Sequence, residues 1–401
     1  MTRPTKLGML AVGCVLFLGG CLLVVDRYTQ NSLWFDMGRV LGKCVAWDTR
    51  ARTACYEDTI ASLYPKHDVT DIFSAMALIQ KVEPGMIDCH FIAHRLGEVV
   101  TYADPDSWPN RIIGEKDDSL CAFGYVHGVT IAAFKDGPLS AAALETELPK
   151  FKKACVGADI TLQQKGNCNH GIGHMLYYVV GKDVPKGLEL CDAVVPGDFK
   201  RNDMGRKRCY AGVLMGVFQG FIRIEDEEVN PFNLSKETSR PFCEALEKDA
   251  YVGACLRQSW PLFSNEIIEQ NGIEKFCANQ PNQEETEWCF AKVFKGVTWY
   301  LINELDRVRS ICTSVSPPWQ KVCFTNAAQE IIEEGAGTEA SVARAVAFCG
   351  QEDARSSREC VEQLLRRAGY FSDQGSSARS AYCAQLPAEL HQECMGKMGE
   401  R

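Results

Sequence analysis

The chain lacks the excess of positive charge with which nucleic-acid-binding proteins neutralise phosphates. Its 52 Asp and Glu residues outnumber its 43 Lys and Arg residues, so the formal net charge is −9. It also has no Walker loop, no dinucleotide-binding glycine fingerprint and no Ser-His-Asp triad signature. The sequence therefore predicts no nucleic-acid partner and contains none of the common motifs for nucleotide binding or serine hydrolysis.

Two metal-binding cysteine spacings are missing as well. The chain has 20 cysteines, yet no Cys-x2–4-Cys pair of the structural zinc type and no Cys-x-x-Cys-His motif for haem attachment occurs. So many cysteines would be exceptional in the reducing cytosol and are ordinary in a secreted or periplasmic protein. The cysteines therefore predict disulfides and an oxidising compartment.

One long uncharged segment lies near the N-terminus. Residues 7–25 are nineteen mostly apolar positions, preceded by Arg3 and Lys6 and followed by Asp26 and Arg27. A helix of that length spans about 28 Å, close to the hydrocarbon thickness of a bilayer. Because the basic residues come first, the positive-inside rule places the bulk of the chain outside the cytoplasm. We expect an uncleaved signal anchor, and hence a single-pass membrane protein.

A cleaved lipoprotein signal is the alternative interpretation of this segment. Leu18-Gly19-Gly20-Cys21 resembles the lipobox of bacterial lipoproteins, which would make Cys21 the lipidated first residue. The apolar residues 22–25 that follow are unusual for that family. Either interpretation predicts a protein that is attached to a membrane and faces away from the cytoplasm.

The eighteen cysteines outside this segment recur with a regular spacing. Sixteen of them form eight neighbouring pairs with separations of 11 to 18 residues. From residue 243 onward the first cysteine of each pair recurs every 34 to 37 residues, the length of one helix-turn-helix repeat. The pairs are Cys44/Cys55, Cys155/Cys168, Cys191/Cys209, Cys243/Cys255, Cys277/Cys289, Cys312/Cys323, Cys349/Cys360 and Cys383/Cys394.

The residues around each pair predict a helical hairpin. Residues 341–349 form a helix-like run that ends on the first cysteine of a pair, and residues 350–358 form a polar loop. The second cysteine of a pair opens a helix, as at Cys289, after which apolar residues recur at helical spacing. Each disulfide would then join two successive helices and contribute about 3 kcal/mol in the chain-entropy model. Cys89 and Cys121 remain, and their pairing would link the starts of two neighbouring helices.

These features predict an all-α, disulfide-stapled solenoid of about nine helical hairpins with an N-terminal transmembrane helix. The period is similar to that of tetratricopeptide repeats, and because their Trp, Gly and Tyr signature is missing, the resemblance concerns period and architecture only. We expect a signal anchor in residues 1–28, a histidine-rich repeat region in residues 29–240 and cysteine-paired repeats in residues 241–401.

Five of the seven histidines fall within 85 residues, in three cysteine-headed motifs. The motifs are Cys89-His90-x3-His94, Cys121-x5-His127 and Cys168-x-His170-x3-His174, and in two of them the i, i+4 spacing places both rings on one helix face. Neutral imidazole is the commonest protein ligand of zinc, copper and iron. We therefore expect one or two ions of iron, copper or zinc, with haem less expected, at a site made of His90, His94, His127, His170, His174 and Glu98. The other two histidines, His67 and His391, are expected to be ordinary surface residues.

The repeat register brings the histidine motifs together. His127 and His174 both lie six residues after a cysteine, and equivalent positions of successive helices in a solenoid line one surface. Glycines inside a helix cost about 0.5–1 kcal/mol each relative to alanine, so their presence here indicates a close approach, either of helix to helix or of helix to ligand. They are Gly124, Gly128, Gly171, Gly173, Gly212 and Gly216. Three residues after the cysteine, where these repeats have glycine, the later repeats have Gln258, Lys292, Asn326 and Gln363.

The three motifs, read as CHxxxH, CxxGxxHG and CxHGxGH, are similar to those of an uncharacterised group of bacterial envelope proteins. The resemblance covers roughly residues 86–220 and implies no particular activity. From the residues we expect a membrane-anchored, extracytoplasmic metal-binding protein with a role in oxidoreductase chemistry or metal handling. The alternative is a helical-repeat scaffold that recruits an envelope protein partner and holds no metal.

Overall fold

All regular structure in the described part of the chain is helical. No strand occurs there, which confirms the all-α prediction. The predicted membrane segment at residues 7–25 lies outside the described residues, and no described helix combines the length and apolar character needed to cross a bilayer. The computed structural model describes residues 32–45, 49–79, 83, 89–114, 121, 124–134, 138–156, 162–195, 204–218, 232–269, 271–334, 339–350, 360–361, 364 and 383–399.

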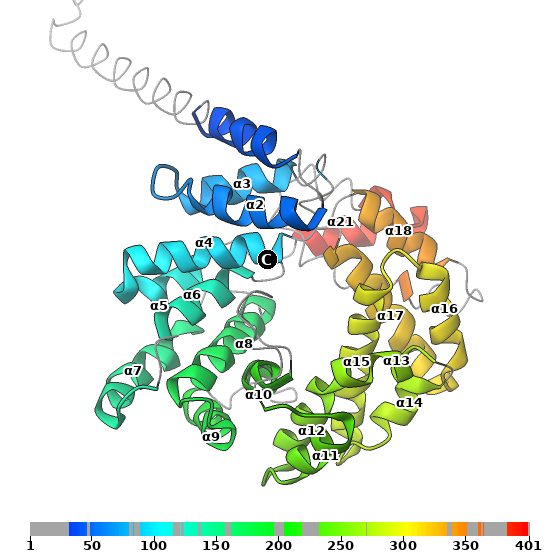
Figure 1. Cartoon of the computed structure of the whole chain (residues 1–401). Coiled ribbons are helices and arrows are strands. Elements are labelled where there is room, and N and C mark those ends of the chain that lie inside the picture. The colour runs from blue at the N-terminus through cyan, green and yellow to red at the C-terminus, as the bar shows by residue number, and fades with distance from the viewer. Residues whose placement is uncertain are drawn as a thin grey trace, which may run out of the picture.

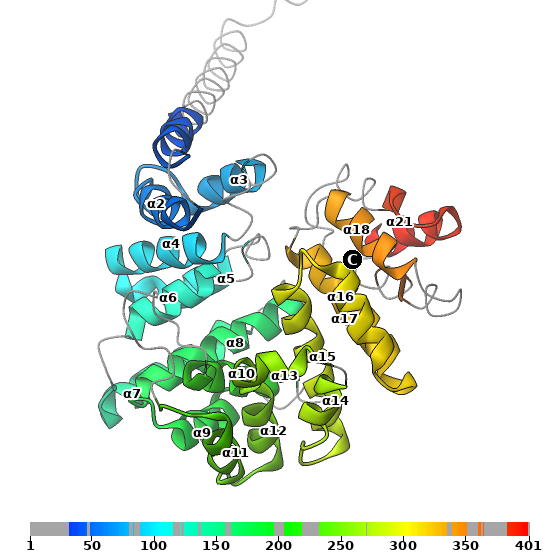
Figure 2. The same ribbon diagram turned by 45° about the vertical axis from the view of Figure 1, so that its right-hand side comes forward.

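One set of helices forms a continuous stack in which each member packs against the next. The stack follows a curved path through the molecule (Figures 1 and 2). Its members are α2 (Thr49–Ala61), α4 (His90–Ala103), α6 (Gly124–Phe134), α8 (Leu162–Val179), α10 (Met204–Phe218), α12 (Asp249–Gln258), α15 (Gln283–Tyr300) and α17 (Pro317–Glu334).

The remaining helices separate the stack members along the chain. Several of them pack on a stack helix to complete a hairpin, such as α9 on α8 and α10, and α16 on α17. The described residues before α2 are helical at positions 32–44. The others are α3 (Val69–Ile79), α5 (Trp108–Gly114), α7 (Ala141–Ala154), α9 (Val184–Val194), α11 (Lys236–Glu244), α13 (Ser264–Ile267), α14 (Gly272–Cys277), α16 (Leu305–Ser314), α18 (Glu339–Cys349) and α21 (His391–Gly399).

The disulfides link the helices as the cysteine spacing predicts. All eight neighbouring pairs are bonded, with Cα–Cα distances of 5.3–5.8 Å. Cys89 and Cys121 form the ninth bond, at a Cα–Cα distance of 5.1 Å, and it joins the start of α4 to the residue that shortly precedes α6. Helical repeats and nine disulfides are therefore confirmed.

One detail of the predicted hairpin is wrong. The second cysteine does not open its helix but usually lies seventh in it, because antiparallel helices overlap and a cysteine near the end of the first helix meets the second helix about two turns from its start. The cysteines in seventh position are Cys55, Cys168, Cys255, Cys289 and Cys323.

Glycines let α4 and α6 pack backbone against backbone. A Cβ atom on Gly128 would lie 1.8 Å from the carbonyl oxygen of His94, and one on Gly124 would lie 2.0 Å from the carbonyl oxygen of His90. Real Cβ contacts are essentially never this short, so only glycine fits. The sequence left two explanations for such glycines, and helix-to-helix approach accounts for both Gly124 and Gly128.

The pair α8 and α10 repeats this packing. A Cβ on Gly173 would lie 2.1 Å from the carbonyl oxygen of Cys209, and one on Gly212 would lie 2.1 Å from the carbonyl oxygen of His170. The two close pairs meet where Gly171 of α8 faces Val126 of α6. A Cβ atom added at Gly171 would lie 2.6 Å from the Cγ1 atom of Val126. All three histidine-bearing helices are thus held at short range.

The buried apolar residues form two clusters, one from Leu33 to Leu256 and one from Ile267 to Cys394. A buried ionic group joins α10, α12 and α15 near the change from one cluster to the other. Glu285 accepts from Lys207 at 2.8 Å and from Arg257 at 2.6 Å, and all three side chains are buried. The predicted domain limit at residue 240 stays a prediction.

His67 is not the surface residue that we expected. Its ring is buried, and its Nε2 lies 2.8 Å from Oδ2 of Asp36, a carboxylate 31 residues earlier in the chain. Hydrogen bonds from His67 and Lys66 lower the pKa of Asp36 to about 2. The prediction was wrong because the buried partner comes from a separate helix. His391 is partly buried and donates through Nε2 to the carbonyl of Leu386 at 2.7 Å.

We expect Gly128→Ala to lower the free energy of unfolding by about 1–3 kcal/mol or more, because the added methyl group forces α4 and α6 apart. The measurement is urea denaturation of the disulfide-bonded chain, followed by circular dichroism. Gly38→Ala is the matched control, since a Cβ there meets nothing within 4 Å, and it should be neutral or stabilise by about 0.4–1 kcal/mol. Equal effects of the two changes would contradict the packing account.

Candidate metal centre

Five imidazoles form one row across three neighbouring helices. His94 and His90 come from α4, His127 from α6, and His174 and His170 from α8. In this order the distances between neighbouring ring centroids are 6.4, 5.2, 4.6 and 4.5 Å. The structure therefore brings all five histidines named from the sequence to one place.

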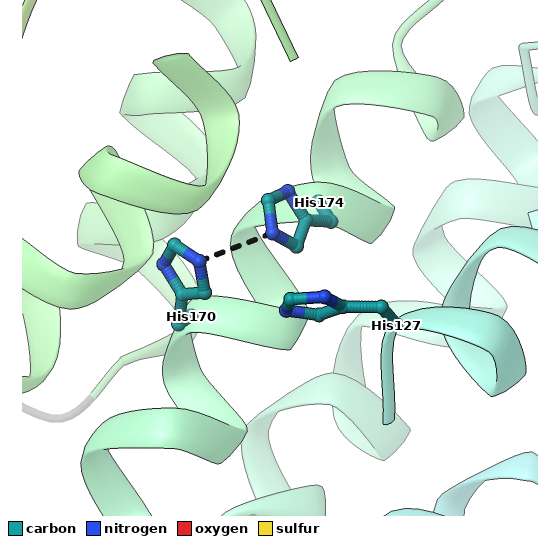
Figure 3. A group of neighbouring side chains, drawn as sticks. All are labelled: His127, His170 and His174. Atoms are coloured by element: carbon teal, nitrogen blue, oxygen red, sulfur yellow. Dashed lines mark hydrogen bonds between the residues drawn. The ribbon is translucent and has the colours of Figure 1, made fainter. Parts of the chain in front are cut away.

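Three of these rings are close enough to share one ion. One ligand atom from each of His127, His170 and His174 lies within 4.8 Å of the other two. The Nε2 atoms of His170 and His174 are 3.2 Å apart. Figure 3 shows His127 extending from its own helix toward the two histidines of α8.

In two of the rings, Nδ1 is held by a backbone carbonyl oxygen, which only accepts hydrogen bonds. His90 Nδ1 lies 3.2 Å from the carbonyl oxygen of Cys121, and His170 Nδ1 lies 3.2 Å from the carbonyl oxygen of Arg208. In a neutral ring the proton must then reside on Nδ1, which leaves the lone pair on Nε2. Metal-binding histidines typically show this arrangement.

Glu98 contacts the row through His94 and does not belong to the three-histidine group. Its Oε1 lies 3.2 Å from Nδ1 of His94, and its Oε2 accepts from Arg95 at 2.8 Å. Burial alone would raise the pKa of Glu98, but the contacts with His94 and Arg95 outweigh it and lower the pKa. Glu98 is therefore an ionised carboxylate that orients the ring of His94.

Burial keeps the central rings neutral. The exposed fractions of His127 and His174 are 5% and 0%, and burial together with the neighbouring imidazoles holds the pKa of both well below 6.5. Burial, followed by repulsion from Arg208 and Lys292, lowers the pKa of His170 to about 3. At neutral pH these three rings carry lone pairs and no charge.

The helix that continues the stack beyond α8 carries a methionine in place of a histidine. Gly124 and Gly128 flank His127 in α6, and Gly212 and Gly216 flank Met215 in the same way in α10. The α10 helix packs on α8 as α6 packs on α4, but it carries Met215 where α6 carries His127. The imidazole row therefore ends at α8.

The sequence-based interpretation missed two cations beside the row. Lys292 of α15 and Arg208 of α10 both lie close enough to His170 for their charge to lower its pKa. A signal was present for Lys292, because it stands three residues after a cysteine, where the histidine-bearing repeats have glycine. Nothing in the sequence indicated that α15 reaches the neighbourhood of α8.

Comparison of the chain with protein-family models, with curated proteins and with solved structures finds no match. The chemistry of the site therefore has to be argued from its own residues. Buried, neutral and pre-oriented imidazoles suit a transition-metal ion better than magnesium or calcium, which prefer oxygen ligands.

We expect the metal-free protein to lose stability as the pH falls below about 6.5. His127 and His174 titrate near that value when unfolded and far below it when folded, so the unfolded state binds more protons in between. Each group then lowers the free energy of unfolding by about 1.4 kcal/mol per pH unit, and the two together lower it by about 3 kcal/mol per pH unit. Unfolding free energies measured between pH 7 and pH 5.5 test this slope.

The double variant His127→Gln/His174→Gln should lose most of that slope, whereas the control His391→Gln should keep it. An unchanged slope in the double variant would show that the two rings do not titrate as their burial requires.

Proposed function

We propose that this protein binds a transition-metal ion, iron, copper or zinc, through His127, His170 and His174. The observation that supports the proposal is the approach of three imidazole nitrogens to within 4.8 Å of one another on buried rings. Such a cluster of neutral donors with no carboxylate among them favours a borderline metal ion over a hard one.

One pair of ligand atoms already has the separation that a bound ion requires. Zinc–nitrogen bonds of about 2.0–2.1 Å in a tetrahedral site place the ligand atoms roughly 3.3 Å apart. The Nε2 atoms of His170 and His174 already lie 3.2 Å apart. Since His170 donates through Nδ1, its Nε2 accepts the proton of His174 Nε2, and an ion placed between the rings would displace that proton. The displaced proton would move to Nδ1 of the same ring, and because the three rings are already neutral, metal uptake near pH 7 should release few protons.

His90 and His94 extend the donor set. The Nε2 atom of His94 is buried and has no hydrogen-bond partner among the described residues, while its Nδ1 is held by Glu98. This is the carboxylate–histidine arrangement found behind metal ligands. His94 and His90 could therefore complete the coordination of one ion or hold a second ion next to the first.

The proposed setting is the outer side of a membrane. Nine disulfides favour an oxidising compartment, and the charges around the apolar residues 7–25 support a signal anchor, with lipidation at Cys21 as the alternative. In this setting the site would serve oxidoreductase chemistry or metal handling. The competing function is a scaffold for an envelope protein partner, for which the histidines would be incidental.

We expect the purified chain, stripped of metal and titrated with Zn²⁺, Cu²⁺ or Co²⁺, to take up at least one equivalent. His127→Ala and His174→Ala should each weaken binding by more than about 100-fold, since even the loss of a residue that only orients a ligand typically costs 10–100-fold. Isothermal titration calorimetry measures the affinity, and the same titration in a second buffer checks that few protons are released.

His391→Ala, which removes a histidine outside the row, is the matched control and should bind as the unmodified chain does. A folded chain that takes up no ion, or whose affinity is the same in all variants, would refute the metal site and favour the scaffold.

Glu98→Gln should weaken metal binding by about 10–100-fold if His94 is a ligand, because the amide no longer fixes the His94 ring as a carboxylate does. The same titration measures this effect. Glu147→Gln is a suitable control, since Glu147 is a helix carboxylate paired with Lys150 away from the row. An unchanged affinity in Glu98→Gln would show that His94 is not a ligand of the metal ion.

A further inference from the structure

The helix at residues 32–44 has one buried face and one exposed face. Leu33 and Met37 of the buried face belong to the first apolar cluster, and a disulfide joins Cys44 to Cys55 of α2. The helix is the outermost described element at its end of the molecule, beside α2 and α3 (dark blue in Figures 1 and 2). The opposite face is exposed along its whole length, at residues 34, 35, 38, 39, 42 and 43.

Two adjacent aromatic side chains lie on this exposed face, at the start of the helix. Trp34 is 45% exposed and Phe35 is 69% exposed, the highest value for a large apolar side chain in the described part of the chain. Single exposed apolar residues are common on proteins in water, whereas neighbouring aromatic residues on one helix face are typical of helices at a membrane surface. Gly38 and Gly42 continue the face without a side chain, and a Cβ atom at either would meet nothing within 4 Å.

The charges of the helix are divided between its two faces. Asp36 is its only acidic residue, and this carboxylate is 4% exposed and contacts Lys66 at 2.5 Å and Arg39 at 2.8 Å. The exposed face carries Arg39 and Lys43. The Arg39 side chain is 69% exposed, and its guanidinium group lies 5.4 Å from the centroid of the Phe35 ring. The face therefore combines aromatic rings with positive charge and has no exposed carboxylate, a combination that suits anionic lipids.

The length of chain before this helix places it near the predicted membrane segment. Only residues 26–31 separate that segment, residues 7–25, from Ser32. Since a chain extends by at most about 3.6 Å per residue, the helix begins within about 25 Å of the end of the segment. Trp is enriched where a membrane-spanning segment meets the lipid headgroups. Position and composition therefore favour lipid over a second protein as the partner of this face.

We propose that the exposed face of the helix at residues 32–44 lies on the outer surface of the membrane, with Trp34 and Phe35 among the lipid headgroups and Arg39 next to the lipid phosphates. This inference rests on the proposed membrane attachment and does not depend on the metal site. Because the helix is about 20 Å long and is bonded to α2, its contact with lipid would orient the whole stack, and with it the histidine row, relative to the bilayer.

The test uses the full chain reconstituted in vesicles of equimolar phosphatidylcholine and phosphatidylglycerol. In one preparation the phosphatidylcholine carries bromine on its acyl chains near the headgroup, where it quenches tryptophan fluorescence at short range. We expect brominated lipid to quench part of the emission of the seven tryptophans. Trp34→Phe should lower this lipid-dependent quenching by at least about twofold, because Trp34 is the ring at the interface.

Trp299→Phe is the matched control. Trp299 has a similar exposed fraction, 47%, and it belongs to α15, which lies apart from the helix at residues 32–44 in both views (Figures 1 and 2). This change should leave the lipid-dependent quenching as it is in the unmodified chain.

A second pair of variants tests whether the aromatic face holds the helix on the lipid. Phe35→Ser should also reduce the quenching of Trp34, because the ring that is most exposed to water would no longer contact lipid. Tyr300→Ser removes a 59% exposed ring from the end of α15 and should have no effect. Both substitutions change exposed side chains, so the fold should be retained, which circular dichroism checks.

The outcomes separate the face from the membrane attachment. A chain that floats with the vesicles but is quenched equally in the unmodified form and in Trp34→Phe would overturn the lipid-facing helix and leave the attachment intact. A full chain that does not float with the vesicles would overturn both, and the metal titration would still decide the metal site.

Discussion

The backbone contact between α4 and α6, repeated between α8 and α10, is the constraint on which the histidine row depends. Glycines at the crossing points allow one helix to touch the carbonyl oxygens of another, including those of His90 and His94. Two helices at such short range have little freedom to slide or rotate, because either movement would bring a side chain of one helix against the backbone of the other. Rigid helices can therefore present imidazoles at distances that a loop would not maintain.

The same packing explains why the rings are neutral and oriented. Close helices exclude water from His127 and His174, and the loss of solvation disfavours the protonated form. It also brings backbone carbonyls within reach of the ring nitrogens, as at Cys121 and Arg208. Burial without these acceptors would leave polar atoms unsatisfied, and acceptors without burial would leave the rings free to protonate. Together they produce neutral, oriented nitrogen donors, which the proposed metal site requires.

The disulfides have a different role at the site than elsewhere. Eight of them join successive helices of one hairpin, which restrains each repeat locally. Cys89–Cys121 instead links the residue just before α4, next to His90, to a residue shortly before α6, six positions ahead of His127. The buried ionic group of Lys207, Arg257 and Glu285 then connects α10 to α12 and α15, the helix that carries Lys292. The row of histidines and the cations beside it thus belong to one connected stack.

What the sequence by itself determined was the content of short segments: helices, cysteine pairs and histidines in a shared register. Cysteine separations of 11 to 18 residues and the i, i+4 histidine spacing are local, so they predict the paired hairpins and the face that each imidazole occupies. Tertiary structure decided which atoms meet. The approach of His127 to His170 and His174, and the burial of His67 against Asp36, join residues that lie far apart in the sequence. Such contacts depend on how each helix is rotated and how far it crosses its neighbour, and these angles follow from packing along the whole stack.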